Sequence, residues 1–285
     1  MGRMGDSNVL ITGTPRSGTT LVCHLLNKLD DTVALSEPMK TGNLVKLPSL
    51  AAVPSAVHRF CDSQRESLLT RKRAISKNVD GVLADNTFAN EAGMRKGISS
   101  KGEIRVDKPL SPNFTLILKH PAIFTASLEE LVKHFPVYTI MRNPLAVMAS
   151  WNSIESLLRK GRVPVAEKLD PVLHDTLQRL RNPIDRQIHI LDWYHSRWHR
   201  YLQPENFIRY EDIVSSKGAA LSVVHPAAGQ FDEPLTSRNI GDAYDREMTL
   251  RLGERLLASD GSHWRSYSKE SVQRLLETMT VTNIA

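Results

Sequence analysis

The apolar positions near the start of the chain follow the pattern of a strand, a loop and a helix. Asn8–Thr12 is a short apolar run that ends at a cluster of glycine and proline. Apolar residues then recur at helical spacing from Leu21 to Leu29, and a second short run follows at Thr32–Leu35. This order predicts a strand-helix-strand unit with parallel strands and a right-handed connection.

The pattern weakens between residues 38 and 110, where charges, prolines and glycines are scattered without a clear period. We interpret this stretch as loops and helices inserted over the sheet. Regular spacing returns with an apolar run at Phe114–Leu118, helical spacing through Leu128, Leu131 and Val132, and a further run at Val137–Met141. These residues predict a second strand-helix-strand unit.

The remainder of the chain alternates in the same way. A helix is expected over 145–158, because Pro144 suits the first position of a helix, and a long helix over 183–202. A last strand at Asn206–Tyr210 and helices near 244–258 and 268–280 follow. The whole pattern predicts an α/β fold with a doubly wound, mainly parallel sheet, helices on both faces, and ligands at the carboxyl ends of the strands.

Composition narrows the class of protein. With 41% hydrophobic and 24% charged residues among 285, the chain falls outside the disordered and fibrous classes. No apolar run approaches the length of a membrane helix, and residues 1–6 lead into the first strand without the apolar core of a secretion signal. Two cysteines, Cys23 and Cys61, are too few for a zinc cluster. We therefore expect a cytoplasmic protein in a reducing compartment, without membrane contact.

Charge points to an anionic partner. The formal net charge is +6, and residues 38–112 alone hold 13 basic and 7 acidic side chains. Charge by itself does not separate a nucleotide, a nucleic acid and an acidic substrate. Nucleic-acid binding is poorly supported, because the basic stretch lacks interleaved aromatic residues.

The segment between the first strand and helix, Gly13–Thr20, has the composition of a phosphate-binding loop. Its two glycines stand at the spacing of a P-loop, and backbone N–H groups at a helix start can hold an anion. Thr19 occupies the position where nucleoside triphosphatases carry lysine, which argues against kinase activity. Arg16 places a positive charge inside the loop instead, within reach of a bound phosphoanhydride.

This loop resembles the phosphate-binding loop of sulfotransferases that use 3′-phosphoadenosine 5′-phosphosulfate (PAPS), in the form with arginine found in tyrosylprotein and many bacterial members. Arg142 with Ser150, eight residues later, resembles the family's 3′-phosphate motif, and Gly261–Arg265 resembles its late Gly-x-x-Trp-basic turn. Phe207–Asp212 resembles the family's late strand and the Tyr-Glu-Asp sequence that follows it. Glu211 and Asp212 suit the first turn of a helix. The resemblance implies a P-loop-like sulfotransferase fold with PAPS bound by loop and motif residues: Arg16, Ser17, Gly18, Thr19, Thr20, Arg142, Ser150, Trp264 and Arg265. For Trp264, packing in the core is the alternative.

The resemblance also implies a catalytic set and a reaction. A sulfuryl group would pass from PAPS to a hydroxyl or amine, leaving 3′-phosphoadenosine 5′-phosphate (PAP), with no metal required. Glu37, 21 positions after Arg16, would be the general base, and Lys119 a second cation beside Arg16. His120 is the alternative base, ranked behind Glu37 because adjacent strand residues point to opposite faces.

Several alternatives stay open. A P-loop small-molecule kinase and a nonenzymatic nucleotide-binding regulator share much of the pattern. The acceptor could be a small molecule, a glycan or a peptide, and the oligomeric state is not indicated. We expect one sulfotransferase domain over 1–285, with 38–112 as an insertion or lid on the acceptor side. Its basic residues would either hold an acidic acceptor or merely keep the protein soluble.

Overall fold

A computed structural model describes residues 8–89 and 94–281, so the expectation for residues 1–6 lies outside the described residues. Its centre is a five-stranded sheet in the order β2-β5-β1-β6-β7, in which every neighbouring pair is parallel. The strands are β1 (Asn8–Gly13), β2 (Thr32–Ser36), β5 (Thr115–Lys119), β6 (Val137–Met141) and β7 (Phe207–Arg209). The predicted strands and their parallel direction are confirmed.

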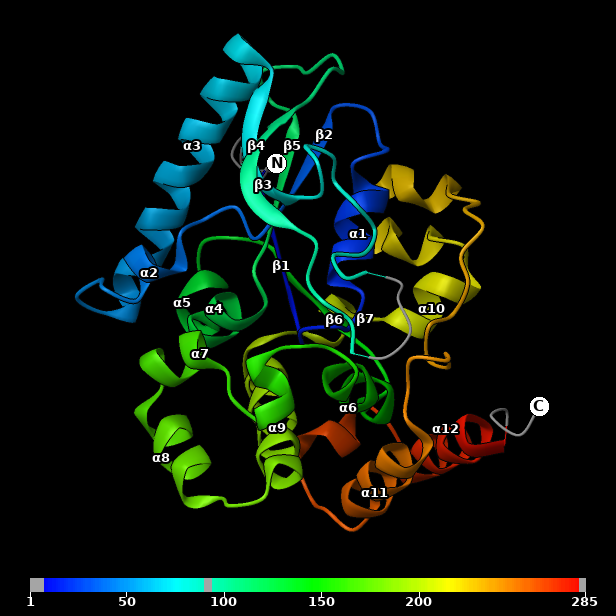
Figure 1. The fold of residues 1–285 in the computed structure, drawn as a ribbon. Helices are drawn as coiled ribbons and strands as arrows, with labels where there is room; N and C mark the ends of the chain where they lie inside the picture. Colours follow the sequence, from blue (N-terminus) through cyan, green and yellow to red (C-terminus); the bar gives the residue numbers. More distant parts are fainter. Residues whose placement is uncertain (1–7, 90–93, 282–285) are drawn as a thin grey trace.

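Twelve α-helices in the described residues surround this sheet (Figure 1). They are α1 (Thr19–Leu26), α2 (Thr41–Leu44), α3 (Val53–Arg71), α4 (Pro121–Ala126), α5 (Leu128–Leu131), α6 (Pro144–Asn152), α7 (Pro164–Leu169), α8 (Pro171–Arg179), α9 (Pro183–Tyr201), α10 (Tyr210–Ser215), α11 (Arg246–Leu257) and α12 (Lys269–Val281). Across the described part of the chain, none of them has the length and apolar character that crossing a membrane requires.

Alternation along the central strands divides the hydrophobic core into two layers. In β1, Leu10 belongs to the core shared with α3, α4, α6 and α9. Its neighbours Val9 and Ile11 belong to the core shared with α1 and α10 on the other face. Because successive strand residues point to opposite faces, a fully apolar strand needs helices on both sides. The predicted doubly wound architecture is therefore present, with α1 and α10 on one side of the sheet (Figure 1).

The order of the strands directs the functional loops to one edge. From β1 the chain passes to β2 and β5 on one side, and it then crosses β1 to reach β6 and β7 on the other. The carboxyl ends of β1, β5 and β6 thus surround the point where the direction of winding changes. Open α/β sheets bind their ligands at such points.

Residues 38–112 contain more regular structure than the sequence predicts. A 19-residue helix, α3, is followed by an antiparallel hairpin of β3 (Arg73–Asn78) and β4 (Ser100–Arg105). The expectation of loops and helices alone was wrong, because the buried residues of β3 include the polar Ser76 and Asn78, which hide the strand period. Ser76 Oγ accepts a hydrogen bond from the backbone N–H of Ser36, so the hairpin is fixed to the end of β2.

Two predicted helices differ in extent. The helix after β5 is divided into α4 and α5 at Ser127. The helix begun by Pro144 ends at Asn152 instead of residue 158, because the next residues leave the helix to pair with Arg95. The backbone N–H of Arg95 donates to the Ser153 carbonyl, and that of Glu155 donates to the Arg95 carbonyl. A contact 58 residues distant in sequence therefore ends this helix.

Candidate functional site

The loop between β1 and α1 is a tight turn that depends on its glycines. Gly18 has a φ of 95°, and a Cβ there would lie 2.6 Å from the ring of Tyr210. A Cβ on Gly13 would lie 2.5 Å from the Ile140 carbonyl oxygen of the neighbouring strand. Glycine is the residue that accepts such a backbone conformation and such close approach without strain. The glycine spacing seen in the sequence thus reflects steric needs of the turn.

The turn presents hydrogen-bond donors that the described residues leave without partners. No side chain caps the start of α1, and the first N–H groups of a helix have no partner within the helix. Ser17 is completely buried, and its hydroxyl has no hydrogen-bond partner in the part of the chain that the structure describes. A helix start with an unpaired buried hydroxyl beside it fits an anion.

Arg16 stands at the centre of the site. Its Nε donates to Ser150 Oγ at 3.2 Å, a terminal nitrogen donates to Asn86 Oδ1 at 3.3 Å, and the guanidinium lies 4.5 Å from the centroid of the Phe88 ring. Burial, together with the charges of Arg95 and Arg142, lowers the pKa of Arg16 to about 10. Arg16 is therefore still a cation at neutral pH.

Arg142 follows the end of β6 and is buried. Its Nε donates to Asn239 Oδ1 at 2.8 Å, and a terminal nitrogen donates to the Arg16 carbonyl at 2.9 Å. The guanidinium lies 4.8 Å from the centroid of the Tyr210 ring. Ser150, its predicted partner, instead receives the hydrogen bond from Arg16, so Arg142 and Ser150 lie on two sides of Arg16.

Two residues of this region, Arg95 and Asn239, were not anticipated from the sequence. Arg95 is buried, donates to Ser153 Oγ at 2.5 Å, and has an unpartnered Nε among the described residues. Asn239 links Arg142 to Glu211, whose carboxylate accepts from Asn239 at 2.9 Å and from the Tyr267 hydroxyl at 2.7 Å. Glu211 therefore does more than begin α10. Neither Arg95 nor Asn239 lies in a periodic stretch, so no local signal marks them.

Two cavities meet at the loop, and both are lined by Arg16, Thr19 and Thr20. The first, of about 220 Å³, we name the Arg142 cavity. Its remaining walls include a glycine, two arginines, one aspartate, Tyr210 of α10 and the segment before Asn239: Gly18, Arg142, Arg238, Asp85, Tyr210 and Leu235. Asp85 forms an ion pair with Arg238 at 2.9 Å. The second, of about 290 Å³, we name the Glu37 cavity, because Glu37 and Lys119 lie in its wall.

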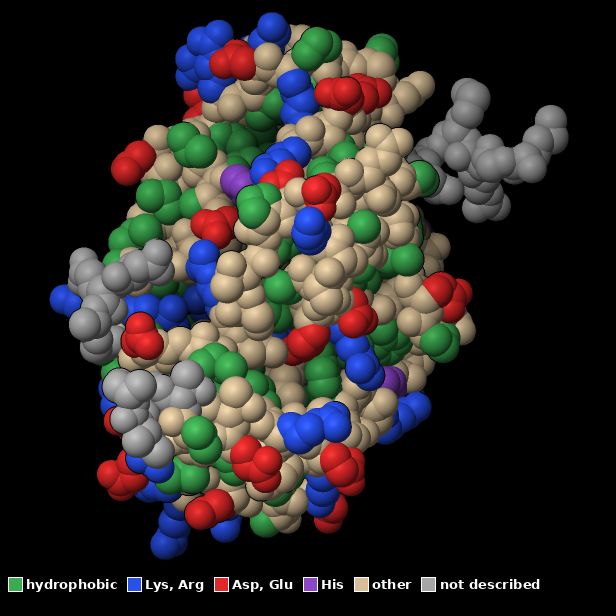
Figure 2. Space-filling model, turned by 90° about the vertical axis from the view of Figure 1, so that its right-hand side faces the viewer, with side chains coloured by type: hydrophobic (Ala, Val, Ile, Leu, Met, Phe, Trp, Pro, Cys, Tyr) green, Lys and Arg blue, Asp and Glu red, His purple; other side chains and the backbone are tan. Residues whose placement is uncertain are grey.

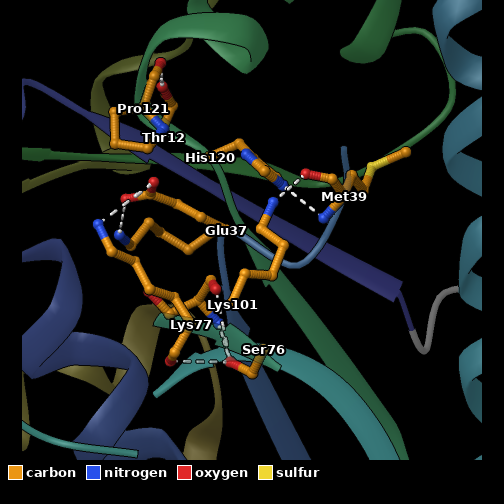
Figure 3. A network of polar contacts seen from close by, with 10 residues as sticks. Thr12, Glu37, Met39, Ser76, Lys77, Lys101, His120 and Pro121 are labelled. Carbon is orange, nitrogen blue, oxygen red and sulfur yellow. Dashed lines mark hydrogen bonds and ion pairs between the residues drawn. The ribbon is translucent and has the colours of Figure 1, made fainter. Parts of the chain in front are cut away.

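Glu37 and Lys119 form an ion pair in the second cavity. Lys119 Nζ lies 2.9 Å from Glu37 Oε1. Lys77 Nζ, from the β3–β4 hairpin, lies 3.9 Å from Glu37 Oε2, and Figure 3 shows Lys77 beside Glu37. Burial acts to raise the pKa of Glu37, but the two ammonium groups outweigh it and hold that pKa well below its usual range. The carboxyl group is therefore ionised at neutral pH. It is a weak base as long as Lys119 stays paired with it.

His120 holds the chain that follows Glu37. Its Nε2 accepts a hydrogen bond from the backbone N–H of Met39 at 3.0 Å, and Lys101 Nζ donates to the Met39 carbonyl (Figure 3). Burial lowers the pKa of His120 to about 3, so the imidazole is neutral. Lys119 and His120 both line the Glu37 cavity although they are adjacent, because β5 ends at Lys119.

The structure does not bring Trp264 and Arg265 to the loop. Both belong to η6 (Ser262–Arg265), which packs against α9. The indole of Trp264 donates to the Ser259 carbonyl at 2.9 Å, Arg265 is exposed, and neither residue lines either cavity. Their sequence neighbourhood matched a motif, but the segment holding Arg142 is Arg238–Asn239 instead.

The basic residues of 38–112 are directed mostly away from the site. Among the described residues of this stretch, Lys77 is the lysine or arginine that lines the Glu37 cavity. Others are engaged elsewhere: Lys108 donates to the carbonyls of Asn27 and Leu29, and Arg105 pairs with Asp107. On the face drawn in Figure 2, basic side chains are interspersed with acidic ones. Most of the local charge excess therefore does not surround the cavities.

Comparisons with known proteins add little to this geometry. No family model matches the chain, and no curated protein matches it. Among solved structures, the chain is similar to the sulfotransferase domain of the Synechococcus PCC 7002 olefin synthase, with 15% identity and a TM-score of 0.39 over 96% of this chain and 94% of that one. In the part of the chain that the structure describes, no three His, Cys, Asp or Glu residues are grouped so as to hold a metal ion.

Proposed function

We propose that this protein is a sulfotransferase that moves a sulfuryl group from PAPS to an acceptor hydroxyl. One observation carries the proposal: the anion-binding turn and the Glu37–Lys119 pair line the same cavity. A group held by the turn is thereby adjacent to a carboxylate and an ammonium. Proton removal and charge neutralisation are what sulfuryl transfer needs from a protein.

The two cavities suit the two ends of the donor. The turn, with Ser17, Thr19 and Thr20, would hold the 5′-phosphosulfate, because no side chain caps the start of α1 and the buried Ser17 hydroxyl has no partner among the described residues. Arg142 and Arg238 in the Arg142 cavity would hold the 3′-phosphate. Ser150 positions Arg16 through its 3.2 Å hydrogen bond. Trp264 and Arg265 lie outside both cavities, and we assign them no contact with the donor.

In the proposed reaction the acceptor oxygen forms a bond to sulfur while the bond from sulfur to the bridging oxygen of PAPS breaks. The acceptor proton passes to Glu37, and the electron pair of the broken bond leaves on the 5′-phosphate of PAP. Arg16 and Lys119 would balance the charge on the transferred group and the leaving phosphate. When Lys119 turns from Glu37 toward the sulfuryl group, Glu37 loses a cation, its pKa rises, and it becomes a stronger base.

Ligand-dependent thermal stability tests the assignment. PAP is expected to raise the melting temperature of the protein, whereas ATP with Mg²⁺ raises it much less, because only PAP places a phosphate at Arg142. Equal stabilisation by PAP and ATP would overturn the proposal and favour a kinase. Mass spectrometry with PAPS and an acceptor panel then separates an enzyme from a nonenzymatic regulator, since only the enzyme adds a sulfo group to an acceptor.

A further inference from the structure

The Glu37 cavity has a polar side and an apolar side. Its polar side is formed by Arg16, Glu37, Lys77 and Lys119, around the proposed point of transfer. Six further lining residues are apolar and come from the 86–88 loop, α4 and the region after α6: Phe88, Ala122, Ile123, Ile154, Leu158 and Val165. An acceptor with its hydroxyl at Glu37 would therefore place the rest of its body against hydrocarbon and an aromatic ring.

The volume of the cavity limits the acceptor. A cavity of about 150 Å³ is enough for a benzene molecule. The Glu37 cavity has about 290 Å³, and part of this space must hold the sulfuryl group itself. One ring with a short substituent fills the remainder, and a larger acceptor would have to leave most of its body outside the cavity.

The charges of the cavity disfavour an acidic acceptor. Lys119 and Lys77 both face Glu37, at 2.9 and 3.9 Å, and Arg16 with Lys119 would face the anionic donor. A carboxylate on the acceptor would find these cations engaged and the Glu37 carboxylate nearby, so part of its charge would be desolvated without a partner. Among the described residues of 38–112, the other lysines and arginines do not line the cavity.

One polar group in the apolar region lacks a partner. The hydroxyl of Ser156 is buried, has no hydrogen-bond partner among the described residues, and belongs to the wall that also contains Ile154 and Leu158. A single neutral polar group on the acceptor would satisfy it. Buried hydroxyls without partners are costly, so this position is suited to selecting a ligand.

From these observations, and resting on the proposed sulfuryl transfer, we infer that the acceptor is a compact, uncharged phenol or alcohol with an apolar body. The apolar residues of the Glu37 cavity determine this specificity. Among the described residues, both lysines that line this cavity face Glu37, and Arg16 would face the donor. The basic stretch 38–112 contributes Lys77 to the wall of the Glu37 cavity and does not recruit an acidic acceptor.

The test compares matched acceptors with PAPS saturating. para-Propylphenol and the phenol of equal length that ends in a carboxylate differ in one charge, and an acidic tyrosine-containing peptide tests the larger class. We expect kcat/KM for para-propylphenol to exceed that for either acidic acceptor by about tenfold or more, with little dependence on salt. Preference for the carboxylate or the peptide at low salt would overturn the inference while leaving sulfuryl transfer intact.

A variant localises the effect to the cavity. Leu158→Trp fills the apolar side and should raise KM for para-propylphenol about tenfold or more, with the thermal shift given by PAP unchanged. Its control is Leu157→Trp, at an exposed neighbour that does not line the cavity, where KM should stay as in the unmodified protein. Equal KM values for the two variants would overturn the placement. A different outcome would be that PAP does not stabilise the unmodified protein and that no acceptor is sulfated. This result would overturn sulfuryl transfer itself, and the inference about the acceptor with it.

Discussion

The two cavities that meet at Arg16 balance their charges in different ways. In the Arg142 cavity, Arg238 forms an exposed ion pair with Asp85, whereas the buried Arg142 donates to carbonyl and amide oxygens and lies on an aromatic ring. In the Glu37 cavity, two lysines face a carboxylate. Neutral hydrogen-bond acceptors orient the guanidinium without cancelling its charge. A phosphate can therefore still bind to it. A carboxylate with a neighbouring lysine instead forms a pair that can separate during proton transfer. The contrast suggests one cavity for holding phosphate and one for chemistry.

The largest expected effect separates these two roles. Glu37→Gln should lower kcat by about two to four orders of magnitude, the usual contribution of a positioned base, while the melting-temperature shift given by PAP is retained. Turnover of sulfated product and thermal shift are measured on the same preparation. Glu103→Gln, in the neighbouring hairpin, is the matched control, because its carboxylate pairs with Arg73 outside the cavity. An active Glu37→Gln together with an inactive His120→Asn would show that His120 is the base.

The next effect concerns the Arg142 cavity. Arg142→Ala should weaken the binding of PAP by about tenfold to a hundredfold and that of ADP, which has no 3′-phosphate, much less. A hydrogen bond to a charged group contributes about 1.5 to 3 kcal/mol. Dissociation constants from calorimetry decide this. Since Arg142 also holds Asn239, the less disruptive Arg142→Lys tests binding in a protein that keeps the charge. Arg255→Ala, at an exposed ion pair, is the control. Equal weakening of PAP and ADP would contradict a 3′-phosphate contact.

The same two regions differ in how well the sequence predicts them. The strands and the loop around Arg16 were predicted because local signals coincide there: an apolar run, glycines at a fixed spacing, and helical periodicity after Thr19. The architecture follows from such signals since parallel strands buried on both faces are apolar throughout. Glu37, Lys119 and Arg142 end or follow strands of this sheet, so their proximity was also predictable in outline.

Residues that meet the site from distant segments were not predictable. Lys77 lies on a strand whose inward positions include Ser76 and Asn78, so no apolar alternation marks it. Asn239 reaches Arg142 from 97 positions away, in a stretch without helix or strand. Trp264 is the reverse case: a local motif matched, but η6 packs on α9 and Trp264 lines neither cavity, in agreement with the alternative of core packing. Local patterns record backbone preferences, whereas these contacts depend on tertiary packing.

A third prediction asks whether the Arg142 cavity depends on the backbone of the turn. Gly18→Ala should reduce the free energy of unfolding by about 1 to 3 kcal/mol, because the φ of 95° disfavours a side chain and the new Cβ would lie 2.6 Å from the Tyr210 ring. Chemical denaturation measures this. Gly42→Ala is a suitable control, since a Cβ there meets nothing within 4 Å. Equal stability of the two variants would mean that the turn tolerates a rearrangement the structure does not show.

The smallest expected effect is a pH dependence that originates in the Glu37 cavity. Burial lowers the pKa of His120 to about 3, from an ordinary value of 6.5. Between these values the unfolded chain binds a proton at this residue and the folded protein does not, so stability must fall as the pH decreases from 6.5 toward 3. The slope attributable to His120 approaches about 1.4 kcal/mol per pH unit. His120→Gln keeps an acceptor for the Met39 N–H, whose bond to His120 is 3.0 Å long, but cannot titrate.

The free energy of unfolding of both proteins is measured with denaturant at pH 7.5, 6.5 and 5.5. His195 and His263 are also buried with lowered pKa values, but they are present in both proteins, so the difference between the two profiles isolates His120. The unmodified protein should lose about 1 kcal/mol more than His120→Gln between pH 6.5 and 5.5. Parallel pH profiles would mean that the unmodified imidazole gains solvent or a carboxylate partner as the pH falls. In that case His120 would be free to exchange a proton within the Glu37 cavity, and the distinction between a positioning histidine and a basic carboxylate would no longer hold.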